Sequence, residues 1–145
     1  MRQPSFLKRS WLAALTAALG IMFAVFAYVQ LNDTNPEIYH QPSVLDAWSW
    51  LFFYGFIAVL CIVSIFRRVP RVLLGVAAAF CLVEMARTVP GLYANLFEAE
   101  KFSMTATSMA AAHPEVELTR EFFGALIGLA GVGFLWWQAS KAERR

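Results

Sequence analysis

Four long apolar segments, over residues 11–31, 48–66, 72–89 and 122–137, divide the chain. The stretch before the fourth segment reads as a helical lead-in, so the expected spans are about 11–31, 48–66, 72–89 and 115–138. As a helix rising about 1.5 Å per residue, each would cross most or all of a hydrocarbon core about 30 Å thick. The pattern predicts a single membrane domain over residues 1–145. Its fold class is an all-α integral membrane protein with four transmembrane helices in a bundle.

The first apolar segment shares features with a secretory signal peptide. It follows three basic residues, and Val25-Phe26-Ala27 resembles a cleavage site. Its apolar run from Trp11 is longer than the roughly 7–15 residues of a signal-peptide core. We therefore interpret this segment as an uncleaved transmembrane span.

Composition supports the membrane assignment. Hydrophobic residues make up 59% of the chain and charged residues only 15%, whereas a soluble domain has about 25% charged residues. This balance argues against a soluble enzyme and against a nucleic-acid-binding protein. The many arginines and alanines favour a bacterial source with a GC-rich genome.

The distribution of charge predicts the orientation in the membrane. Nine of the twelve Lys and Arg residues precede the first span, join the second to the third, or follow the fourth. Most acidic residues lie in the two other connections, and all five Trp residues lie at span ends. The positive-inside rule then places both termini in the cytoplasm. We expect a multi-pass protein of the bacterial cytoplasmic (inner) membrane.

The second outer connection, over residues 90–121, is long for a helix bundle. Within it, Phe97, Lys101 and Met104, together with Phe102, have the spacing of a short amphipathic helix on the membrane surface. An ordered loop with a single helical turn is the alternative interpretation.

Small residues recur at helical spacing on two spans. Gly20 belongs to such a stripe in the first span, and Gly124, Gly128 and Gly131 form one in the fourth. Transmembrane helices associate through close backbone packing, which small residues permit. We expect these glycines to pack against neighbouring helices of the same chain, with contact to a second copy as the alternative.

Charged residues inside the third span are the most informative polar feature. Glu84 and Arg87 lie three residues apart, on one helix face, where they can form an ion pair. A charge at membrane depth costs about 2.5–3.5 kcal/mol on insertion scales, so both should face the bundle interior. We expect them to meet polar residues at the end of the first span and the start of the fourth: Gln30, Asn32, Asp33, Arg120 and Glu121.

This predicted cluster has two interpretations. It is either a structural network that holds the four helices in register or a small site open to the outer side. In the second case Arg87 and Arg120 would bind a polar or anionic head group. A proton relay has less support, because one intramembrane acid does not make a path.

The sequence predicts no cofactor and no metal site. Both histidines, His40 and His113, lie in the outer loops, whereas a haem in a bundle needs axial ligands from the helices. Cys61 and Cys81 lie within apolar spans, at no metal-type spacing. No nucleotide-binding or catalytic motif is present in the sequence.

Two stretches resemble the transmembrane protein 220 family. Residues 30–36, QLNDTNP, are similar to the family's Q-x-N-D-P-D-P signature, and residues 117–124, ELTREFFG, are similar to its E-x-x-R-E-x-x-G stretch. The resemblance implies a four-span architecture over essentially the whole chain. It also points to Gln30, Asn32, Asp33, Arg120 and Glu121. The family has no established biochemical activity, so the resemblance implies no reaction.

The function that the sequence favours is that of an accessory or interaction subunit of a membrane complex, without catalysis of its own. The alternative is a lipid- or small-molecule-binding protein, or an enzyme, that uses the outer polar cluster. The expected partners are the lipid bilayer and other membrane-protein subunits, and no nucleic acid. The sequence does not indicate an oligomeric state.

Overall fold

The computed structural model describes residues 6–32, 43–99, 102–104 and 113–143. In this part of the chain the regular structure is entirely helical. The elements are α1 (Phe6–Val29), the 3₁₀ turn η1 (Gln30–Asn32), α2 (Val44–Phe66), α3 (Arg71–Phe97) and α4 (Pro114–Glu143).

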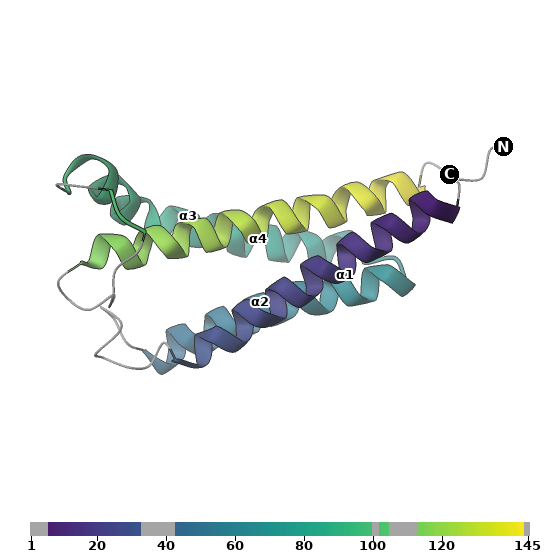
Figure 1. Ribbon diagram of the computed structural model, residues 1–145, viewed down its shortest axis with the longest axis horizontal. Coiled ribbons are helices and arrows are strands. Elements are labelled where there is room, and N and C mark those ends of the chain that lie inside the picture. The colour runs from purple at the N-terminus through teal and green to yellow at the C-terminus, as the bar shows by residue number, and fades with distance from the viewer. Residues whose placement is uncertain (1–5, 33–42, 100–101, 105–112, 144–145) are drawn as a thin grey trace.

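All four α-helices are long and apolar enough to span a membrane, as the sequence predicted. They run alternately up and down along the long axis of the molecule (Figure 1). At one end of the bundle α1 begins, α4 ends and α2 is joined to α3; at the opposite end α1 and α3 end and α2 and α4 begin (Figure 1). The predicted four-helix membrane bundle is therefore confirmed.

The bundle consists of two helical hairpins. Most close contacts between elements are made within the α1–α2 pair and within the α3–α4 pair, while α2 meets α3 and α4 at few points. Aromatic side chains pack both within the α1–α2 hairpin and across to the α3–α4 hairpin. Tyr54 stacks with Trp50 and Phe23, and the rings of Phe53 and Phe80 stack with centroids 4.5 Å apart.

The glycine positions singled out in the sequence lie at helix contacts within the chain. A methyl group added at Gly20 would lie 3.2 Å from Cys61, and one at Gly128 would lie 3.1 Å from Phe53. The other two contact aromatic side chains in the same way: Gly124 faces the hydroxyl group of Tyr54, and Gly131 faces the ring of Phe23. These faces are thus occupied by the protein's own helices.

A hydrogen bond joins the first and last helices near the end that carries the termini. Gln138 Nε2 donates to Thr16 Oγ1 at 2.9 Å, and Thr16 in turn donates to the Leu12 carbonyl of its own helix. Thr16 is buried. In a bundle surrounded by lipid, such polar contacts hold helices together where the hydrophobic effect cannot.

The third helix is longer than its apolar segment. It continues through Pro90 to Phe97, so the predicted loop start at residue 90 is wrong. Proline removes one backbone hydrogen bond, but packing beyond it keeps the segment helical. Gly91 lies against Leu118 of α4, and Asn95 is buried beside the same helix. The α3–α4 hairpin therefore extends beyond the outer ends of α1 and α2.

The predicted amphipathic helix falls only partly within the described residues. Phe97 is the last residue of α3, and residues 102–104 are not helical. Lys101 lies outside the described residues. What is described of this connection is a short segment held against α3 and α4.

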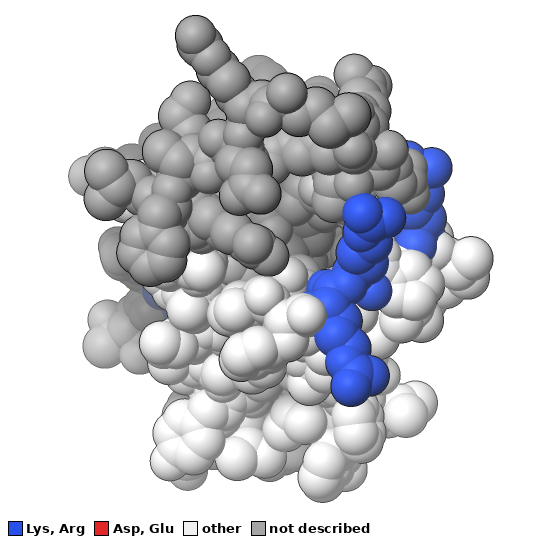
Figure 2. All heavy atoms as spheres, turned by 90° about the vertical axis from the view of Figure 1, so that its right-hand side faces the viewer, with Lys and Arg blue, Asp and Glu red and all other residues white. Residues whose placement is uncertain are grey.

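Basic side chains gather at the end of the molecule that carries the termini. Figure 2 views this end and shows Lys and Arg, with no Asp or Glu among the side chains that the structure describes there. The exposed basic residues at this end are Arg67, Arg68, Arg71 and Lys141. The charge asymmetry seen in the sequence is thus an asymmetry between the two ends of the bundle.

Candidate functional site

An arginine bound to carboxylates lies toward the opposite end of the bundle. Arg87 Nε donates to Glu84 Oε2 at 2.7 Å, and its Nη2 donates to Glu121 Oε2 at 2.8 Å. Nη2 also lies 3.9 Å from Asp46 Oδ1. We call these four residues, Asp46, Glu84, Arg87 and Glu121, the outer cluster.

Three helices supply the outer cluster. Glu84 and Arg87 lie on one face of α3, Glu121 lies in the second turn of α4, and Asp46 lies in the first turn of α2. Asp46 is placed by a helix cap, because the side chain of Ser43 accepts a hydrogen bond from the Asp46 backbone. The cluster therefore ties the α1–α2 hairpin to the α3–α4 hairpin, where other contacts are few.

The outer cluster is half open. The side chains of Arg87 and Asp46 are 39% and 41% exposed, while those of Glu84 and Glu121 are 15% and 18% exposed. Glu84 and Glu121 thus form the inner wall, and Asp46 and Arg87 form the rim. A molecule that approaches from the lipid or from the outer surface meets the rim first.

Arg120 does not join Arg87 in one site. Its Nε donates to the Met104 carbonyl, at 2.6 Å, in the outer connection. Adjacent residues of a helix point in different directions, so Glu121 faces Arg87 while Arg120 faces the connection. The hydrogen bond from Arg120 Nε is thus made to the outer connection, whereas Arg87 binds Glu84 and Glu121.

A second polar network holds this connection in place. Asn95 Nδ2 donates to the Ser103 carbonyl at 2.8 Å and to Thr119 Oγ1 at 2.9 Å. Asn95 Oδ1 accepts from the Ser103 backbone N–H at 3.1 Å. Asn95 and Thr119 are almost fully buried. These bonds fix the described part of the connection against the ends of α3 and α4.

The remaining residues of the predicted cluster are at the end of the first span. Gln30 and Asn32 belong to η1, which packs against α2. Gln30 is half-buried, and the Asn32 side chain is outside the described part of the structure. Asp33 also lies outside the described residues. The structure thus brings together Glu84, Arg87 and Glu121 of the predicted set.

Sequence reasoning missed three contributors, namely Asp46, Asn95 and Thr119. Asp46 carried a signal, since Ser43 and Asp46 have the spacing of a helix-capping motif just before an apolar run. That spacing places an acid in the first turn of α2, at the height of Arg87. Asn95 had no such signal, because its role depends on α3 continuing beyond Pro90.

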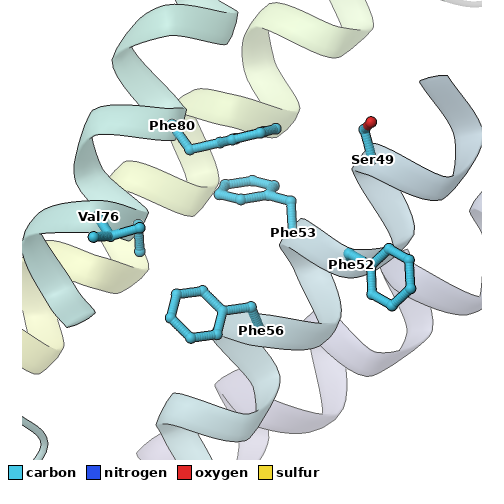
Figure 3. A pocket seen from close by; sticks show the side chains of 7 residues that line it. Ser49, Phe52, Phe53, Phe56, Val76 and Phe80 are labelled. Carbon is cyan, nitrogen blue, oxygen red and sulfur yellow. The ribbon is translucent and has the colours of Figure 1, made fainter. Parts of the chain in front are cut away.

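An apolar groove lies between α2 and α3, below the outer cluster. Its volume is about 350 Å³. Figure 3 shows aromatic rings from both helices around it, with Ser49 at one end. Its lining residues are Ser49, Phe52, Phe53, Phe56, Val76, Ala77 and Phe80.

The groove opens toward the outside of the bundle. Phe52 and Val76, which border it on α2 and α3, are 66% and 57% exposed. In a membrane these side chains face lipid tails. A gap of this kind fills with hydrocarbon, because an empty one would forfeit dispersion contacts along its walls.

The outer cluster lies directly beyond one end of the groove. On α2, Asp46 precedes the groove residue Ser49 by three positions, and on α3, Glu84 follows Phe80 by four. Both spacings correspond to about one helical turn on the same face. The outer cluster therefore lies about one helical turn beyond the groove, although none of its four side chains lines the groove.

Among the described residues, no group of three or more His, Cys, Asp or Glu side chains is positioned to hold a metal ion. Cys61 and Cys81 are free thiols buried in the core. What the outer cluster offers is hydrogen bonding and charge.

Comparison with known proteins identifies a family but no characterised relative. The family model "Transmembrane family 220, helix" matches residues 22–137, which is most of the chain. The match confirms the resemblance seen in the sequence, and it includes all four residues of the outer cluster. No curated protein and no solved structure matches the chain.

Proposed function

We propose that the chain, which belongs to transmembrane family 220, binds a single lipid-like amphiphile in the groove between α2 and α3. The observation that carries this proposal is an open apolar groove with a half-exposed charged cluster about one helical turn beyond its outer end. The hydrocarbon chain of the ligand lies along the groove, and its polar head meets the outer cluster. This is the alternative that the sequence left open beside an accessory role.

The geometry favours this function over a structural role alone. The rim of Asp46 and Arg87 is exposed, at the position where a head group would lie. The Asp46–Arg87 distance of 3.9 Å is also longer than the other two contacts of the guanidinium.

Native mass spectrometry tests the proposal. The protein is purified in detergent and exposed to a mixture of lysophospholipids of one chain length, and retained adducts are counted. Val76→Trp, which places an indole in the groove, should reduce adduct retention severalfold for every head group. Val72→Trp is the matched control, since Val72 is exposed on the same helix but does not line the groove. Equal retention by both variants would contradict the proposal.

The accessory role is a second candidate, favoured by an apolar surface on the outer end of α3. Tyr93, Leu96 and Phe97 are exposed there. Phe97 lies ten residues beyond Arg87, or about 15 Å along the helix. Exposed apolar patches outside the hydrocarbon core are typical of protein contacts. A native gel in mild detergent that shows only free monomer would contradict this role.

The proposed location is the cytoplasmic membrane of a bacterium, with both termini in the cytoplasm. The support is the basic end of the bundle, which carries the termini (Figure 2). Basic residues concentrate on the cytoplasmic side of membrane proteins. The outer cluster and the mouth of the groove then lie near the outer surface of the membrane.

A further inference from the structure

The charges of the outer cluster are unbalanced. Three carboxyl groups, from Asp46, Glu84 and Glu121, surround the single guanidinium of Arg87. With all three ionised, the formal charge of the group is negative by two. It stays negative even if one carboxyl holds a proton. A group of this kind repels an anionic head and attracts a cation.

The contacts leave the carboxylates with capacity for a further donor. Arg87 engages one oxygen each of Glu84 and Glu121, and it reaches one oxygen of Asp46 only at 3.9 Å. An ionised carboxylate has about four acceptor positions. Asp46 is the most exposed of the three acids and lies on the rim. Its carboxylate is therefore the group that a head seated in the groove would reach.

The groove specifies where that head lies. The stacked Phe53–Phe80 pair lines the groove, and both rings lie seven residues from the cluster, Phe53 from Asp46 and Phe80 from Arg87. Seven residues correspond to about 10 Å along each helix. A chain packed along this pair thus carries its first polar atoms to the height of Asp46 and Glu84.

We infer that the amphiphile bound in the groove has a primary ammonium head, which donates hydrogen bonds to Asp46 and Glu84. This inference rests on the proposed function and names the chemical class of its ligand. A primary ammonium supplies three donors and one positive charge, which match the acceptors and the negative excess. A zwitterionic lipid with an ethanolamine head meets these requirements, and its phosphate would lie toward the exposed edge of Arg87.

The test is a head-group competition. Lysophosphatidylethanolamine and lysophosphatidylglycerol with the same acyl chain are added in equal amounts to the purified protein, and adducts are measured by native mass spectrometry. We expect the ethanolamine lipid to be retained about fivefold more, as an ion pair of moderate strength would give. Equal retention, or preference for the glycerol head, would overturn the inference.

Two variants test whether the preference for the ethanolamine head group depends on Asp46. Asp46→Asn should bring the retention ratio close to one while total adduct stays similar, because asparagine preserves the shape of the side chain and has a helix propensity close to that of aspartate. Glu98→Gln is the control, since Glu98 is an exposed acid at the outer end of α3 that lies away from the groove. A preference that survives Asp46→Asn would overturn the assignment.

The two proposals fail in different ways. If Val76→Trp reduces the retention of both lipids but the head groups compete equally, the groove binds amphiphiles and the ammonium inference is wrong. If Val76→Trp retains both lipids as well as Val72→Trp does, the proposed function itself is wrong. Thermal unfolding of each variant in the same detergent confirms that a loss of binding is not a loss of fold.

Discussion

Arg87 is the residue on which the outer cluster depends, because it supplies the only positive charge there. We predict that Arg87→Met destabilises the protein by about 1–3 kcal/mol. This value lies between those of an exposed ion pair and a buried one, in line with the half-exposed geometry. Reversible unfolding in mixed micelles would measure it. Arg67→Met, at an exposed arginine between α2 and α3, should change stability little, and an equal loss in both variants would contradict the role of the cluster.

Asn95 has a comparable role in the second network. Replacing it with leucine preserves bulk but removes three hydrogen bonds, and it leaves the Ser103 backbone groups and Thr119 to find other partners. An unsatisfied buried polar group costs about 1–3 kcal/mol. We predict faster cleavage by an added protease near residues 102–104 in Asn95→Leu. Leu96→Ala, at the exposed neighbouring position, should leave the cleavage rate unchanged.

At the scale of single helices, packing against the neighbouring helix, rather than intrinsic helix propensity, decides whether replacing a glycine with alanine destabilises the protein. In α3, a methyl group at Gly91 would overlap the Cβ of Leu118, an atom that can move only with its backbone. In α4, no atom outside the helix lies within 4 Å of a methyl group at Gly133. We predict that Gly91→Ala lowers the thermal midpoint and separates the outer ends of α3 and α4. Gly133→Ala should be neutral or stabilising by up to about 1 kcal/mol, and the opposite order would refute this packing argument.

The distinction between local sequence pattern and packing also explains which parts of each helix can be predicted from the sequence. Helix number, order and approximate ends follow from apolar segments long enough to cross lipid, and the four spans were located in this way. The extension of α3 was missed because Pro90 and the polar residues after it are typical of a loop. Its helical state comes from contacts with α4 that only the folded chain supplies.

The sequence predicts the part of the candidate site that consists of charged residues inside an apolar span. Glu84 and Arg87 are conspicuous as charges inside a span, and helical spacing pairs them. In the sequence, Asp46 reads only as an acidic residue in the first turn of a helix. Its place near Arg87 depends on how α2 packs against α3 in the folded chain. The groove could not be predicted, because it depends on the distance between α2 and α3 and on the positions that their aromatic rings adopt.

For the whole molecule, the arrangement of two hairpins explains why a groove exists at all. Each hairpin is closely packed, and α2 and α3 touch at few points. The outer cluster bridges the hairpins on the outer side, and the Gln138–Thr16 hydrogen bond bridges them toward the end that carries the termini. On the α2–α3 side, the stacked rings of Phe53 and Phe80 lie across the seam, and the apolar groove opens along them.

The orientation of this seam in the membrane is the last prediction. If the basic end is cytoplasmic, His113→Cys should react with a membrane-impermeant thiol reagent added to intact cells, because His113 is exposed at the outer end of α4. Lys141→Cys should react only after the cells are permeabilised. The native Cys61 and Cys81 are fully buried and should remain unlabelled, so the unaltered protein is the control. The reverse labelling pattern would place the outer cluster in the cytoplasm, where its amphiphile would come from the inner leaflet.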